Sequence, residues 1–200
     1  MGHITRRWLC RLSAVALGAG LAGVACAAEG SAQAATWQSK ELKFTYMGFT
    51  THYSCDGLAA KVKDILLQLG ARADLQVHEY GCTSTFGRPD PFPGVRAKFS
   101  VLVPLKDTEA AKTAADQIVS ARWHAVQLRL DRDRASAAGE CELIEQAKHQ
   151  ILPLFSTRNV NFSSDCVPHQ LTLKGADLSV EVMEPVPRKA QGQPGAEKNS

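Results

Sequence analysis

The sequence lacks the short motifs that mark the common classes of catalytic and nucleotide-binding sites. After residue 28 there is no Walker A loop, no Gly-x-Ser-x-Gly elbow, no His-Glu-x-x-His helix and no Cys-x-x-Cys pair. A Gly-x-Gly-x-x-Gly pattern occurs at 18–23, but it follows no predicted strand and opens no β-α-β unit. These absences argue against the enzyme classes that carry such motifs, and we expect no cofactor.

Net charge is also absent from the part of the chain that we expect to fold. The whole sequence has 23 Lys and Arg residues against 20 Asp and Glu. Without Arg6, Arg7 and Arg11, basic and acidic residues are equal in number, and their order along the chain forms no basic stripe. A chain with no net positive field is not steered to nucleic acid. We therefore expect no nucleic-acid partner, although local charged patches are compatible with this balance.

No apolar run is long enough to span a membrane, which takes about 20 residues. The longest run, 12–25, follows the three early arginines and precedes small residues in the Ala-x-Ala pattern of a signal-peptidase site. We predict that 1–28 is the cleaved signal peptide of an exported bacterial protein. The mature chain is then periplasmic or secreted and has no transmembrane segment; an N-terminal anchor helix is the alternative.

Two features of this signal concern the export route. Residues 5–11 resemble a twin-arginine signal, although paired arginines also occur in ordinary signals. Cys26 follows a segment that resembles a lipoprotein cleavage box, but Gly23 stands where a large aliphatic residue is expected. The choice between twin-arginine and general export stays open, and a lipid anchor is the less favoured outcome.

Four cysteines follow the signal, and an even number in an exported chain predicts disulfides. Four cysteines allow three pairings. A repeated order of predicted elements chooses among them, because Cys55 and Cys141 each open a helix, and Cys82 and Cys166 each close the strand that follows. We therefore predict the disulfides Cys55–Cys82 and Cys141–Cys166.

The hydrophobic pattern predicts one α+β domain over 29–184. Apolar and polar residues alternate in 95–103 and in other predicted strands, which indicates a sheet with one face in water. We expect an antiparallel or mixed sheet with about three helices packed on its other face and stapled by the disulfides. The predicted strands are 42–46, 74–80, 95–103, 126–130, 160–162, 171–173 and 178–182, and the predicted helices are 56–69, 107–121 and 140–152.

Three finer features complete the expected fold. Asp56 is expected to cap the first helix and Gly70 to end it. The first six elements have ferredoxin-like order, and the chain contains a degenerate repeat in 42–105 and 123–184. The stretch 185–200 is rich in proline and glycine and poor in large aliphatic residues, which predicts a disordered tail.

A symmetric pair of spacings predicts an alternative metal site. His52 lies three residues before Cys55, and His169 lies three residues after Cys166. Two imidazoles and two thiolates hold zinc or copper tetrahedrally, provided that the thiols stay reduced. That arrangement leaves the other two cysteines without partners in an oxidising compartment. Disulfides are therefore the favoured interpretation, and no metal is expected.

The proline-rich loop 87–94 is the candidate partner-binding segment. Its prolines stiffen the main chain, Phe92 offers an apolar anchor, and Arg88 offers a polar contact. The favoured alternative is an ordinary connection in which the prolines end strands and Phe92 packs into the core.

Asp56, His78 and Glu79 are candidates for an acid–base site, because the first disulfide brings them into one region. Asp56 already has a sufficient role as a helix cap. We therefore predict a non-catalytic exported binding or accessory protein with an unknown protein or small-molecule partner. The alternatives are a metal-binding protein and a small enzyme with an unrecognised site.

Overall fold

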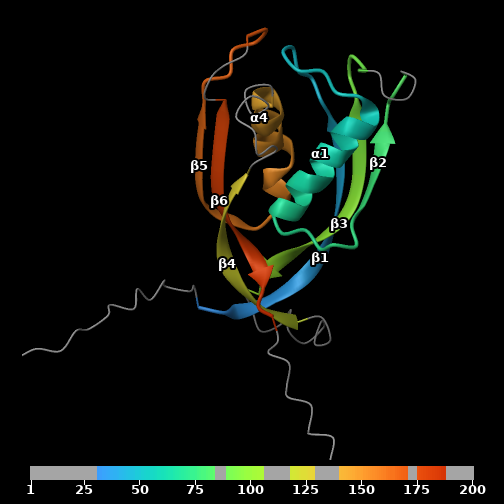
Figure 1. The fold of residues 1–200 in the computed structure, drawn as a ribbon. Coiled ribbons are helices and arrows are strands. Elements are labelled where there is room, and N and C mark those ends of the chain that lie inside the picture. Colours follow the sequence, from blue (N-terminus) through green and yellow to red (C-terminus); the bar gives the residue numbers. More distant parts are fainter. Residues whose placement is uncertain (1–30, 84–88, 106–117, 129–139, 171–174, 188–200) are drawn as a thin grey trace, which may run out of the picture.

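The computed structural model describes residues 31–83, 89–105, 118–128, 140–170 and 175–187. Along the chain the elements are β1 (Gln33–Thr45), α1 (Cys55–Gln68), β2 (Gln76–Tyr80), β3 (Gly94–Pro104), β4 (Ile118–Leu128), α4 (Cys141–Gln150), a short 3-10 helix (Leu152–Leu154), β5 (Thr157–Ser164) and β6 (Ala176–Pro185). The six strands form one sheet in the order β2-β3-β1-β4-β6-β5, and every neighbouring pair is antiparallel. Both α-helices lie on one face of this sheet and share its hydrophobic core (Figure 1).

The two halves of the sheet have the same plan. Each half runs strand, helix, strand, strand, and in each half the last strand lies between the other two. β1 and β4 pair with each other across the middle. Equivalent main-chain hydrogen bonds flank this pair, from the N–H of Leu105 to the carbonyl of Ala34 at 3.0 Å and from the N–H of Val186 to that of Ser120 at 2.9 Å.

Identical residue types also stand at equivalent places in the two halves. One sequence interval relates positions in the first strand and at the start of the helix, and relates a residue after α1 to a residue in β5. A slightly shorter interval relates the two ends of β3 to the residue just before β6 and to the last residue of β6. The predicted repeat, 42–105 and 123–184, covers most of each half but not Trp37 or Pro185, and it stays a prediction. The equivalent pairs are Trp37 and Trp123, Cys55 and Cys141, Arg72 and Arg158, Gly94 and Gly175, and Pro104 and Pro185.

Helix α1 begins one residue earlier than expected and has a different cap. The Ser54 hydroxyl, and not Asp56, accepts a first-turn N–H, that of Gly57, at 3.3 Å. Asp56 instead lies exposed in the first turn, where the helix dipole favours an acid. The chain leaves the helix at Gly70, whose φ of +89° lies in the left-handed region that favours glycine.

The predicted helix 107–121 is wrong at its C-terminal end, because residues 118–121 begin β4 and pair with β1. Ile118 and Val119 are β-branched and suit a strand, and their pairing with β1 joins the two halves into one sheet. The rest of this segment, up to residue 117, lies outside the described residues. The described part of the chain therefore has two α-helices, not the expected three. The ferredoxin-like order needs a helix in the same stretch and stays a prediction.

The predicted tail begins too early in the sequence. Pro185 is the last residue of β6, and the N–H of Val186 bonds to the neighbouring strand. From residue 188 the tail lies outside the described residues, as do the expected signal 1–28 and the predicted strand 171–173. In the ranges that the structure describes, no helix is both long enough and apolar enough to cross a membrane.

Candidate functional site

Three loops gather at one end of the domain, at the top of Figure 1, and we call this surface the loop end. The N–H of Tyr46 donates to the carbonyl of Pro93 at 2.9 Å, which joins the first loop to the second. The ring of Phe49 lies 5.2 Å from that of His169, which joins the first loop to the third. The loop end comprises residues 46–54, 89–93 and 165–170.

Two disulfides anchor the loop end to the helices. Cys55–Cys82 and Cys141–Cys166 have Cα–Cα distances of 6.3 and 5.7 Å, and this is the pairing expected from the repeated order of elements. Each disulfide joins the first residue of a helix to the loop that follows a strand of the same half. Such links restrict the unfolded chain and hold these loops against the helix ends in the folded one.

The alternative metal site is not assembled. Its two cysteines, one of them Cys55, belong to different disulfides, so neither offers a thiolate. Within the described ranges, the group of His, Cys, Asp and Glu side chains close enough to share an ion is Cys55, Glu79 and Cys82, and its two sulfur atoms are bonded to each other. His52 lies in the β1–α1 loop and His169 in the β5–β6 loop, outside this group.

Glu142, near the start of α4, is buried, and its carboxylate holds the β1–α1 loop. Its Oε2 accepts hydrogen bonds from the N–H of Phe49 at 2.9 Å and the N–H of Thr50 at 3.0 Å. The Tyr46 hydroxyl shares its proton between this Oε2 at 3.2 Å and the Thr51 carbonyl at 2.9 Å. Its Oε1 accepts the Thr50 hydroxyl at 3.2 Å. A carboxylate removed from water needs donors of this kind, because they replace its lost hydration. A side chain of the second half thus fixes a loop of the first.

Asp90 holds the proline-rich loop in a similar way and is also buried. Its Oδ2 accepts the N–H of Thr83 at 2.8 Å and the hydroxyl of the same residue at 3.0 Å, and its Oδ1 accepts the N–H of Phe92 at 3.2 Å. The Phe92 side chain is 62% exposed, so the favoured expectation that it packs into the core is wrong. Arg88, the other predicted contact residue, lies outside the described residues.

The loop end thus combines a fixed main chain with exposed apolar side chains. Met47 is 58% exposed and Phe49 is 59% exposed. The amide of Gln146, one turn after Glu142, bonds to both the N–H and the carbonyl of Met47, each at 3.0 Å. Phe49 and Phe92 each donate their N–H to a buried carboxylate. These hydrogen bonds restrict movement of the main chain that would carry Met47, Phe49 and Phe92 toward the core.

Tyr46 makes the stability of this network dependent on pH. Burial, aided by the negative charge of Glu142, raises the pKa of the Tyr46 phenol well above its ordinary value of 10.0. The phenol ionises first in the unfolded chain, so its contribution to stability is complete below about pH 10 and is lost as the pH rises further. We expect the free energy of unfolding to fall by up to about 1 kcal/mol per pH unit above pH 10 through this group.

The matched variant for this test is Tyr46→Phe, which has no phenol to ionise. Urea unfolding of both proteins from about pH 9 to about pH 11 separates Tyr46 from the other tyrosines and lysines. The variant is expected to start less stable and to lose less stability with pH. Parallel pH curves for the two proteins would contradict the role assigned to Tyr46.

The candidate acid–base residues are not brought together. His78 and Glu79 are neighbours in β2, so their side chains lie on opposite faces of the sheet. Both residues contribute to the lining of a hollow, but the Glu79 carboxylate lies beside the Cys55–Cys82 disulfide. Asp56 is exposed in the first turn of α1, where a hydrogen bond from the Ser54 hydroxyl lowers the pKa of its carboxyl. These three groups do not form a site for proton transfer.

Sequence reasoning missed Glu142 and Asp90. Glu142 looks like an ordinary acid in a helix first turn, where the dipole favours one, and Asp90 looks like a loop residue between prolines. Neither differs in sequence from an exposed acid, so only the tertiary contacts identify them. The chain matches no model of a protein family, no curated protein and no solved structure.

Proposed function

We propose that this chain is a non-catalytic exported binding protein that holds a protein partner at its loop end. One observation carries the proposal: Phe49 and Phe92 are exposed, while the N–H of each is held by a carboxylate that is more than nine-tenths buried. Exposed aromatic side chains on a main chain fixed in this way are typical of binding surfaces, because little conformational entropy is lost when a partner covers them.

The chemistry of the loop end favours a protein partner over a small molecule. Met47, Phe49 and Phe92 are each more than half exposed, and Val167 in the third loop is 44% exposed. Aromatic side chains of this kind become the main contributors to binding when a partner surface excludes water from them. Small-molecule sites, by contrast, are concave and bury most of their ligand.

Export is the second part of the proposal. Two disulfides persist in an oxidising compartment and rarely in a reducing cytoplasm. The expected signal at 1–28 provides a route to such a compartment. We place the protein in the periplasm or outside the cell, where both disulfides form after transport.

Site-specific photo-crosslinking in the cell that makes the protein tests this function. Photoreactive benzoylphenylalanine replaces Phe49 or Phe92 in two variants, and Leu67 or Val160 in two matched controls that are exposed apolar residues elsewhere. Crosslinks to one protein species are expected from the loop-end positions and not from the controls. With the partner identified, Phe49→Ala and Phe92→Ala are each expected to weaken its binding by about tenfold or more.

Two results would overturn the proposal. One is equal crosslinking from all four positions, which indicates nonspecific contact. The other is the absence of any crosslinked species from Phe49 and Phe92. Misfolding does not confuse the test, because the replaced side chains contribute little to the core and thermal unfolding verifies each variant.

A further inference from the structure

Three basic side chains form a row across the helix-free face of the first half. Lys43 of β1 lies directly opposite Arg96 of β3, and Arg96 lies directly opposite His78 of β2. All three residues are exposed, and they line an open hollow of about 780 Å³. Adjacent strands are about 4.8 Å apart, so the row spans roughly 10 Å.

This arrangement is unfavourable for the sheet alone, because like charges directly opposite each other repel. The nearest acid in the neighbouring row, Glu41, is engaged with Lys98 at 3.2 Å. Within the described ranges, neither Lys43 nor Arg96 has a carboxylate at ion-pair distance. Glu79 also contributes to the lining of the hollow, but no ion pair joins it to Lys43 or Arg96 among the described residues.

Tyr80 adds a hydroxyl to this row. Its ring lies 4.6 Å from Lys43 Nζ and 4.0 Å from Arg96 Cζ, measured to the ring centroid. Gly94 permits the close approach of this residue, since a Cβ there would come within 2.7 Å of the Tyr80 carbonyl oxygen and 3.2 Å of its ring. The same two cations lower the pKa of the Tyr80 phenol, Lys43 having the larger effect. The phenol is thus a strengthened hydrogen-bond donor beside both charges.

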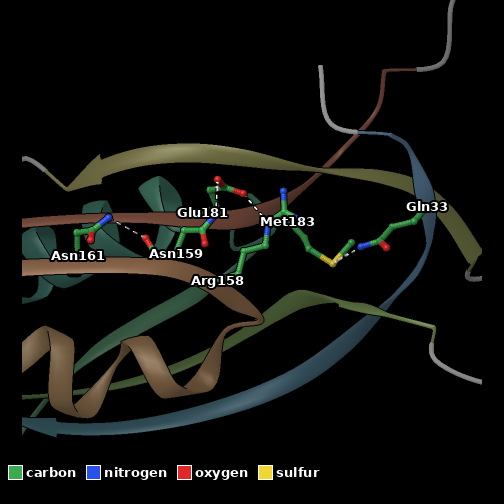
Figure 2. A network of polar contacts seen from close by, with 6 residues as sticks. All are labelled: Gln33, Arg158, Asn159, Asn161, Glu181 and Met183. Carbon is green, nitrogen blue, oxygen red and sulfur yellow. Dashed lines mark hydrogen bonds and ion pairs between the residues drawn. The ribbon is translucent and has the colours of Figure 1, made fainter. Parts of the chain in front are cut away.

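The second half of the sheet provides an internal comparison. Its smaller hollow, about 320 Å³, lies on the corresponding strands, and Asp177 occupies the position equivalent to Arg96. Figure 2 shows how Glu181 in that hollow is neutralised by Arg158 and accepts a hydrogen bond from Asn159 at 2.8 Å. The equivalent strands of the second half therefore pair without a row of cations, so this strand arrangement does not require one.

We propose that the row of Lys43, Arg96 and His78, together with the Tyr80 hydroxyl, binds a phosphate group. A guanidinium fork, an ammonium, an imidazole and a phenol converge from three strands, and a phosphate presents enough oxygens to meet several of them at once. A carboxylate offers only two. A bound anion would also offset the repulsion between the opposed cations of Lys43 and Arg96. This gain would compensate for the unfavourable pairing in the free protein.

The test is NMR titration of the purified protein with inorganic phosphate at constant ionic strength. Saturable shifts are expected at Lys43, Arg96 and His78, with a Kd on the order of 1 mM. Ser179 and Gln127, in the second hollow, are expected not to shift. Lys43→Gln and Arg96→Gln are each expected to weaken binding by about tenfold, because each removes a charged donor. Lys63→Gln, an exposed lysine of α1 on the other face, is the matched control.

A second arm identifies the source of the phosphate. Vesicles of phosphatidylglycerol mixed with phosphatidylcholine are compared with phosphatidylcholine alone by co-sedimentation. If the protein binds the vesicles and Lys43→Gln and Arg96→Gln abolish this binding, the ligand is the phosphate of a lipid head group. If the protein binds inorganic phosphate but not the vesicles, the ligand is a free phosphate ester.

Two outcomes would overturn the proposal. The first is no saturable shift and no vesicle binding. The second is an equal loss of binding in Lys63→Gln, which indicates general charge attraction. Thermal unfolding gives an independent readout, because phosphate is expected to raise the Tm of the wild-type protein and not that of Arg96→Gln. An equal rise in both proteins also counts against the site.

Discussion

Removal of the Cys55–Cys82 disulfide by paired serine substitutions is expected to lower the free energy of unfolding by about 3.5 kcal/mol. The two cysteines are 27 residues apart. A link that closes a loop of this length reduces the conformational entropy of the unfolded chain, and this raises the free energy of the unfolded state by about 3.5 kcal/mol. The loss is a large fraction of the stability of an ordinary domain. Urea unfolding of the oxidised proteins measures it.

The second disulfide is the natural control. Cys141–Cys166 closes a loop of almost the same length, 25 residues, so its removal is expected to cost the same within about 1 kcal/mol. Photo-crosslinking from Phe49 and Phe92 is expected to decline in both variants, because both disulfides hold loops at the end of the domain where we propose that a partner binds. A loss below about 1 kcal/mol for either pair would contradict the role assigned to that disulfide.

Glu142→Ala is expected to lower the free energy of unfolding by about 3 kcal/mol. The substitution leaves the N–H groups of Phe49 and Thr50 without their acceptor in a partly buried place, whereas the Tyr46 hydroxyl keeps the Thr51 carbonyl at 2.9 Å. Unpaired buried donors cost more than a simple lost hydrogen bond, because their hydration is not recovered. Urea unfolding measures the change in stability, and amide hydrogen exchange at Phe49 and Thr50 measures the loosening of the loop.

Glu145→Ala on the same helix is the matched control. Its carboxylate accepts a hydrogen bond from Ser164 at a more exposed place, so its loss is expected to cost less than about 1 kcal/mol. Glu142→Gln, which keeps the shape but exchanges one acceptor for a donor, is expected to fall between the two. Equal stability of the two alanine variants would show that Glu142 does not hold the loop.

Local patterns and the repeated order of elements in the two halves allowed much of the fold to be predicted from the sequence. Alternation over 95–103 and the helical face of 56–69 are local signals, so β3 and α1 were found almost to the residue. The disulfide pairing was found because each pair closes the same order of elements. The segment 118–121 was misassigned because the predicted helix was extended through Ile118 and Val119, whose β-branched side chains suit the strand that pairs with β1.

The candidate binding surfaces were harder to predict from the sequence. Phe92 was recognised as a possible anchor, but its sequence context did not show that its side chain is exposed. Lys43, Arg96 and His78 are far apart along the chain and become a row only through strand register. A shift of one residue in either pairing would place them on different faces.

The sequence by itself determined the disulfide pairing and most of the secondary structure, and it predicts export, because these depend on periodicity, spacing and composition within short segments. Only the tertiary structure decided which acids are buried, which aromatics stay in water and which cations meet. These properties belong to contacts between the two halves and between paired strands, and their free energy arises from desolvation and register rather than from local preference.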